Sequence, residues 1–113
     1  MDKAVNVMSR GNKKSFRTVK KHIQEAIKNG ATLVDVRSPQ EFAAGSVAKA
    51  QNLPVDRISS LSNKLDKNKT IIVFCRSGSR SGQAKQILEQ QGFKNVINGG
   101  TWQQVNSIKN QMK

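Results

Sequence analysis

The 113-residue chain is predicted to fold as a single α/β domain around a mostly parallel sheet. Short apolar runs, of the kind found in buried parallel strands, alternate along the chain with apolar residues at helical spacing. The length is sufficient for one hydrophobic core but not for two. Residues 14–113 are therefore expected to form the domain. The polar and basic residues 1–13 are expected to form a flexible tail or a loosely attached edge strand.

The first half of the chain predicts two helices and two strands. Apolar positions recur at helical spacing over residues 18–30, which end on a glycine that suits a helix terminus. Residues 32–36 form an apolar run typical of a buried parallel strand. Ser38 begins a short helix, because a proline follows at the first helical position and Glu41 can close a capping box. Residues 50–54 predict a brief strand that ends at a proline.

The second half continues the alternation. Residues 56–65 predict a helix that Asp56 caps. The apolar run 70–75 predicts a buried strand, and a helix of about three turns follows a short polar loop. A last strand is predicted at residues 95–97, then a sharp turn at residues 98–100 and a C-terminal helix.

The only cysteine, Cys75, is the most informative residue of the chain. It ends an apolar run and opens a Gly/Ser loop, residues 76–82, that leads into a helix. Such a loop directs backbone N–H groups and the positive end of the helix dipole toward the sulfur. Arg76 and Arg80 lie in the same loop and also favour an anion. We therefore expect a lowered thiol pKa and a nucleophilic role for Cys75.

Other polar residues lie at the carboxyl ends of predicted strands, where parallel α/β sheets bind ligands. Asp35 and Arg37 follow one strand and the turn 98–100 follows another, so we expect both to converge on the pocket that contains Cys75. Two roles are open for Asp35: it either orients groups of the loop after Cys75 or serves as part of the scaffold. Trp102 fits either a roof over the pocket or a place in the core.

Composition narrows the classes of partner. The net charge of +13 suggests small anions, nucleic acid or a membrane surface as partners, or else a solvated basic surface. The absence of tyrosine disfavours a dedicated nucleic-acid module. A single cysteine makes no internal disulfide, and no apolar run has the character of a secretory signal or the length of a membrane span. A cytoplasmic monomer without membrane attachment is expected.

Several segments follow the order and spacing of the signatures of one known family: residues 33–37, 41–45, 50–54, 73–81 and 98–102. The first three together resemble the first signature of the rhodanese family of sulfurtransferases. The fourth resembles its six-residue active-site loop, and the last its C-terminal signature. The resemblance covers nearly the whole domain. It implies a rhodanese-like fold, with a central, mostly parallel sheet of about five strands and helices on both sides.

The resemblance also implies a sulfurtransferase that works through a persulfide on Cys75. The sulfur would come from thiosulfate or a related persulfide donor, and cyanide or a thiol would accept it. Arginine side chains would hold the anionic donor, and backbone N–H groups would cradle the terminal sulfur. The expected substrate-binding residues are Arg76, Ser77, Gly78, Ser79 and Arg80. Neither a metal nor an organic cofactor is implied.

One departure from the family concerns local packing more than catalysis. The family often has Gly-His-Ile where this chain has Gly45, Ser46 and Val47. In the family interpretation Arg37 and Glu41, four residues apart across the helix start, form a structural ion pair.

Two alternative functions remain at this stage. A persulfide carrier or interaction module, serving a partner protein in a sulfur relay, needs the same thiolate and differs from an enzyme in consuming free thiosulfate poorly. A cysteine phosphatase or arsenate reductase is disfavoured, because its loop needs Cys-x5-Arg and Arg80 lies one position closer to Cys75. A buried, inert thiol is also disfavoured, because such a cysteine is rarely followed by a loop with two arginines.

Overall fold

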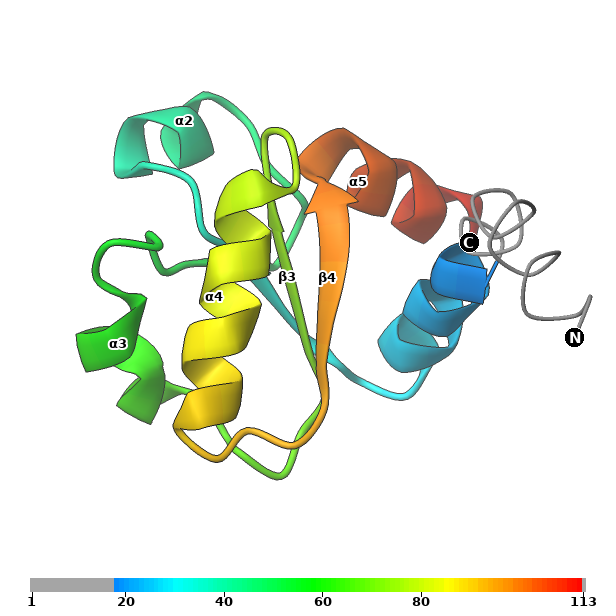
Figure 1. Cartoon of the computed structure of the whole chain (residues 1–113). Helices are drawn as coiled ribbons and strands as arrows, with labels where there is room; N and C mark the ends of the chain where they lie inside the picture. Colours follow the sequence, from blue (N-terminus) through cyan, green and yellow to red (C-terminus); the bar gives the residue numbers. More distant parts are fainter. Residues whose placement is uncertain (1–17, 113) are drawn as a thin grey trace, which may run out of the picture.

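A parallel sheet with helices on both faces forms the centre of the computed structural model, which describes residues 18–112 (Figure 1). The described strands are β1 (Thr32–Asp35), β2 (Gln51–Asn52), β3 (Ile71–Cys75) and β4 (Val96–Thr101). They pair in the order β2-β1-β3-β4, and every pair is parallel. The predicted rhodanese-like α/β class is confirmed, with four strands in the described sheet where about five were expected. The predicted tail, residues 1–13, lies outside the described residues.

The helices divide between the two faces of the sheet. They are a first helix at residues 18–28, α2 (Pro39–Ala44), α3 (Ile58–Leu61) with the 3-10 turn η1 (Ser62–Lys64), α4 (Ser79–Gln90) and α5 (Trp102–Gln111). In Figure 1, α3 and α4 lie on one side of β3 and β4, whereas the first helix and α5 lie on the other. Among the described residues, no helix is long and apolar enough to cross a membrane.

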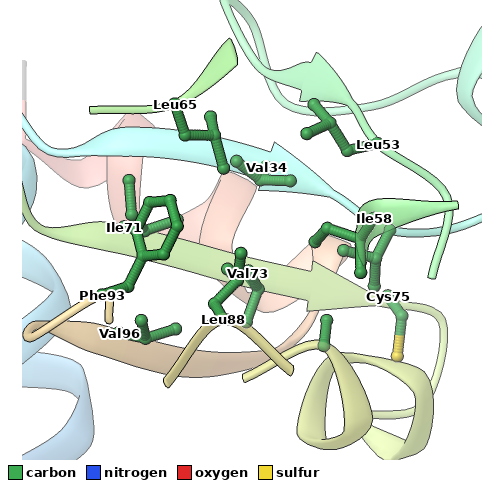
Figure 2. Packing of buried hydrophobic residues seen from close by; sticks show 12 residues of the cluster. Val34, Leu53, Ile58, Leu65, Ile71, Val73, Cys75, Leu88, Phe93 and Val96 are labelled. Carbon is green, nitrogen blue, oxygen red and sulfur yellow. The ribbon is translucent and has the colours of Figure 1, made fainter. Parts of the chain in front are cut away.

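The side chains of β3 alternate between two hydrophobic clusters, as the two-residue period of a strand requires. Val73 and Cys75 belong to the cluster beneath α3 and α4, which Figure 2 shows in detail. Ile72 and Phe74 belong to the cluster beneath the first helix and α5. All five residues of β3 are buried, so the strand passes through the middle of the domain and delivers Cys75 at its carboxyl end.

Local sequence signals set the start of α2 as predicted. The Ser38 hydroxyl accepts a hydrogen bond from the Glu41 N–H, and the Glu41 carboxylate accepts one from the Ser38 N–H, which completes the capping box. The prediction for α3 was wrong in one detail. The helix begins after Arg57, whose N–H bonds the Pro54 carbonyl in a turn, so Asp56 lies one residue too early to cap it.

The predicted sharp turn at residues 98–100 was also wrong, because these residues continue β4 as far as Thr101. Gly99 serves close packing instead. A Cβ atom there would lie 2.8 Å from a methyl group of Val105 on α5 and 3.1 Å from one of Ile72. The change of direction comes at Thr101, whose hydroxyl caps α5 by accepting a hydrogen bond from the Gln104 N–H.

Candidate active site

The loop after β3 places the Cys75 sulfur against the start of α4. Gly78 is the N-cap of α4 and has a φ of +94°, a left-handed conformation that glycine adopts readily. Its N–H donates a hydrogen bond of 2.9 Å to the Cys75 Sγ. Figure 2 shows the sulfur at the carboxyl end of β3, near the first turn of the helix. The whole Cys75 residue has 0% exposure, so the loop covers its sulfur.

The pKa of the Cys75 thiol is lowered by this environment. Burial by itself raises the pKa, but hydrogen bonds to the sulfur outweigh it. In the thiolate form these are donated by the Ser81 hydroxyl, whose Oγ lies 3.5 Å from Sγ, and by backbone N–H groups of Ser81, Ser77 and Gly78. The sequence-based expectation of a stabilised thiolate therefore agrees with the direction of the shift.

The loop side chains predicted to bind substrate occupy different environments. Arg76, Ser77 and Ser79 are exposed, and Arg76 makes no ion pair among residues 18–112. Arg80 is half-buried and donates two hydrogen bonds, of 2.9 and 3.2 Å, to the carboxylate of Glu41. The loop thus holds one cation that pairs with no described residue and one that α2 already binds.

The partner of Glu41 is therefore Arg80, not Arg37 as the family interpretation suggested. The Arg80 guanidinium and the Ser38 N–H lower the pKa of Glu41 from its usual 4.5 to about 2. The same contact raises the pKa of Arg80 further. An ion pair between neighbouring elements, α2 and the first turn of α4, takes the place of the predicted local pair.

Arg37 instead pairs with Asp35, at the carboxyl end of β1. The Nη2 atom of Arg37 lies 2.7 Å from Oδ2 of Asp35, and Nε lies 3.0 Å from both carboxylate oxygens. The backbone N–H of Arg37 donates to the same carboxylate at 2.9 Å. Both residues are buried. Asp35 makes no hydrogen bond to the loop after Cys75, so its contacts are those of a scaffold residue.

Further contacts complete this cluster, which we call the Asp35 network: Asp35, Arg37, Ser46 and Asn52. The Ser46 hydroxyl, at a position where the family often has histidine, donates a hydrogen bond of 2.6 Å to the Asp35 carboxylate. The Asn52 amide donates to the backbone carbonyls of Asp35 and Arg37, each at 3.0 Å. The guanidinium of Arg37 also lies over the Trp102 ring, 5.0 Å from its centroid. Trp102 packs against the cluster beneath α5, which favours the core interpretation of this residue.

Sequence reasoning placed residues 98–100 near Cys75 but assigned no role to Ser81 or to the Asn98 side chain. Ser81 is fully buried, and its hydroxyl lies between the Cys75 sulfur and the Asn98 side chain. Asn98 was assigned to a turn, yet its side chain bonds Ser81 and Gly78. The available signal for Ser81 was its place three residues after the helix N-cap, where a side chain faces back toward the preceding loop.

A pocket of about 570 Å³ lies beside the loop. Residues that follow β1 and β2 line it together with Leu61 and Arg80, while Cys75 does not. The only histidine, His22, is exposed on the first helix. Within residues 18–112, no group of three or more His, Cys, Asp or Glu side chains is placed to hold a metal ion.

Comparison with known protein families matches residues 15–101 to the rhodanese-like domain. The chain belongs to the rhodanese family. This rhodanese domain is 41% identical over 66 residues to a protein named sulfurtransferase from Allochromatium vinosum, covering 58% of the chain and 62% of the relative. It is 38% identical over 69 residues to the thiosulfate sulfurtransferase PspE of Escherichia coli, covering 59% of the chain and 66% of the relative.

A solved structure agrees with the family assignment. The structure of a human single-domain sulfurtransferase superposes with a TM-score of 0.66 at 28% identity, covering 74% of this rhodanese domain and 88% of the human chain. The matches to the two curated relatives span less than two-thirds of the length of each relative.

Proposed function

We propose that this rhodanese domain is a sulfurtransferase that carries a sulfane sulfur as a persulfide on Cys75. The observation that carries the proposal is the single cysteine at the carboxyl end of β3, with its sulfur 2.9 Å from the Gly78 N–H and its pKa lowered. A nucleophile of this kind needs to be a thiolate near neutral pH. The local hydrogen bonds favour the thiolate without a basic side chain.

The proposed reaction has two steps. The Cys75 thiolate attacks the outer sulfur of thiosulfate, a new S–S bond forms, and the old S–S bond breaks so that sulfite leaves with the electron pair. The lone pair of an acceptor, cyanide or a thiolate, then attacks the outer sulfur of the persulfide, and Cys75 leaves as a thiolate. No net proton transfer is needed, so the distance of His22 from the loop is no obstacle.

The loop residues have distinct proposed roles in this reaction. Arg76 is exposed and without an ion-pair partner among residues 18–112, so it is the first candidate to hold the oxygens of the donor. Arg80 uses two of its five N–H groups to bind Glu41, and its remaining N–H groups can also bind the oxygens of the sulfur donor. Because Cys75 is covered, we expect the segment from Ser77 to Ser79 to shift during loading.

Proposed partners are therefore a small anionic sulfur donor and a cyanide or thiol acceptor, or a partner protein that bears a persulfide. The reaction calls for no metal or organic cofactor. A reducing compartment such as the cytoplasm suits it, because the only thiol must remain reduced between turnovers.

Intact-protein mass spectrometry tests the proposal directly. The reduced chain is freed of reductant and mixed with excess thiosulfate, and Cys75→Ser serves as the isosteric control. We expect a gain of one sulfur atom in the wild type, reversed by cyanide and absent in the control. A gain that persists in the control would contradict the assignment to Cys75.

A parallel incubation with inorganic polysulfide separates an enzyme from a carrier. Loading by polysulfide but not by thiosulfate would contradict the proposed donor and would favour a carrier that a partner charges. Loading by neither reagent would contradict the persulfide mechanism itself.

A further inference from the structure

The Asn98 side chain connects β4 to Gly78 and Ser81, both of which contact the Cys75 sulfur. Its Oδ1 atom lies 2.6 Å from the Ser81 Oγ and 2.9 Å from the Gly100 backbone nitrogen. Its Nδ2 atom lies 3.3 Å from the Gly78 carbonyl oxygen. Ser81 and Gly78 in turn lie 3.5 and 2.9 Å from the Cys75 Sγ. We call these four residues the sulfur network: Cys75, Gly78, Ser81 and Asn98.

The directions of these hydrogen bonds follow from the chemistry of the partners. A backbone N–H only donates and a backbone carbonyl only accepts, so Gly100 and Gly78 together fix the orientation of the Asn98 amide. Its oxygen therefore faces Ser81, and at 2.6 Å the Ser81 hydroxyl donates to it rather than to the Gly78 carbonyl oxygen, which lies farther away at 3.0 Å. The hydroxyl has one proton, so in this arrangement Ser81 presents a lone pair to the sulfur.

A lone pair suits the protonated form of Cys75, because the thiol S–H can donate to it. A thiolate has no proton to donate and is stabilised only if the Ser81 hydroxyl rotates to donate to the sulfur. The Asn98 oxygen and the Cys75 thiolate therefore compete for the same proton. Ser81 is fully buried, so this competition takes place in a setting where hydrogen bonds to charged groups are strong.

We propose that Asn98 is a positioning residue that sets the direction of the Ser81 hydroxyl and thereby the balance between thiol and thiolate at Cys75. Asn98 holds the hydroxyl away from the sulfur in the resting state and releases it when the thiolate forms. This inference rests on the proposed function, since it assigns to Asn98 control over the nucleophile of that reaction.

The proposal predicts opposite shifts in the pKa of Cys75 for substitutions of Asn98 and Ser81. Asn98→Leu, which has a similar volume, removes the nearer competing acceptor. Only the more distant Gly78 carbonyl then competes with the sulfur for the Ser81 proton, so the pKa of Cys75 falls. We expect a shift of about 0.5 to 1 unit, a thiolate fraction about three- to tenfold larger below the midpoint. Ser81→Ala removes the donor and shifts the pKa upward instead.

The readout is the ultraviolet absorbance of the thiolate as a function of pH, which reports on Cys75 alone because the chain has one cysteine. Asn95→Leu is the matched control, at an exposed position just before β4, and its pKa should equal that of the wild type. In the double variant Ser81→Ala with Asn98→Leu, the pKa should equal that of Ser81→Ala alone, because Asn98 acts through Ser81.

An unchanged or raised pKa in Asn98→Leu would overturn the proposal, since it would indicate that Asn98 only supports the loop. A further shift in the double variant would overturn it as well. Asn98→Ala replaces the leucine variant if thermal unfolding shows that the latter does not fold, and the same outcomes apply.

The persulfide assay keeps this inference separate from the proposed function. Loading of the wild type together with an unmoved pKa in Asn98→Leu defeats only the role of Asn98. If the predicted pKa shifts are seen but no persulfide forms, the sulfurtransferase proposal is wrong and the role of Asn98 stands.

Discussion

Two neighbouring strands end in buried polar groups that are held in opposite ways. Asp35 at the end of β1 and Cys75 at the end of β3 both have 0% exposure. The Asp35 carboxylate meets the charged guanidinium of Arg37 at 2.7 Å and the Ser46 hydroxyl at 2.6 Å. Among residues 18–112, the hydrogen-bond partners of the Cys75 sulfur are neutral: the Ser81 hydroxyl and backbone N–H groups such as that of Gly78. The countercharge in direct contact gives the Asp35 carboxylate a structural role, whereas the neutral donors leave the Cys75 sulfur free to form a covalent bond.

The largest expected effect comes from removing the sulfur atom of Cys75. Cys75→Ser should abolish sulfur transfer, because an uncharged hydroxyl is a poor nucleophile without an activating base. Its stability should change little, since serine fits the same space. Transfer to cyanide measures the activity, and urea unfolding measures the stability. Activity above background in this variant would contradict the reactive role of the β3 end.

The next largest effect is expected when the Asp35 network loses its carboxylate. Asp35→Ala leaves the buried Arg37 without its countercharge, and we expect a loss of about 3–5 kcal/mol in the free energy of unfolding. The double variant Asp35→Leu with Arg37→Met should recover most of that loss, because it leaves no charge unpaired. Urea titrations measure both. A single-variant loss below about 1 kcal/mol would contradict the anchoring role.

A smaller effect separates the two loop arginines. Arg76→Ala should raise the thiosulfate KM by about tenfold or more, the value of a hydrogen bond to a charged group. Arg80→Ala should raise it less, because Glu41 already binds that guanidinium. Lys94→Ala, an exposed cation just before β4, controls for general loss of charge. Steady-state kinetics with varied thiosulfate decide the order, and an unchanged KM in Arg76→Ala would exclude the proposed contact.

The smallest effect belongs to the ion pair between Glu41 and Arg80, about a third of whose side-chain surface remains exposed. Glu41→Gln should cost at most about 1 kcal/mol of unfolding free energy near neutral pH. The folded pKa of Glu41, about 2, lies below its usual 4.5, so the contribution is present above pH about 5 and is lost as the pH falls toward 2.

Urea unfolding across this pH range tests the prediction for Glu41. The stabilities of the wild type and Glu41→Gln should converge on acidification. A constant difference down to pH about 2 would show that the lowered pKa of Glu41 does not contribute to stability.

Elements with local signals could be predicted from the sequence. The capping box of Ser38 and Glu41 lies within one helical turn, and the strand that ends in Cys75 is a continuous apolar run. The partner of Arg37 could not be predicted in this way. Arg37 precedes the N-cap of α2, so the helical i, i+4 rule that suggests Glu41 does not apply to it. The chain bends at Arg37 instead, and both its backbone N–H and its guanidinium bond the Asp35 carboxylate.

Tertiary contacts account for the remaining differences. The glycines before Trp102 suggested a turn, but Gly99 admits the close approach of α5 to β4. The contact between Asn98 and Ser81 depends on the pairing of β3 with β4, whose register shifts between Val73 and Cys75. The strand order predicts that residues 98–100 lie near Cys75, but no local pattern encodes the hydrogen bond between Asn98 and Ser81, which depends on the folded chain.

The pH dependence of Cys75 alkylation by iodoacetamide tests the central claim most directly. The folded chain is compared with the same chain in concentrated urea, and the single cysteine makes both curves unambiguous. The folded chain should titrate at a lower pH than the unfolded one, because the hydrogen bonds from Ser81, Ser77 and Gly78 stabilise the thiolate. A folded midpoint equal to or above the unfolded midpoint would show that burial dominates, and the end of β3 would then hold a passive thiol.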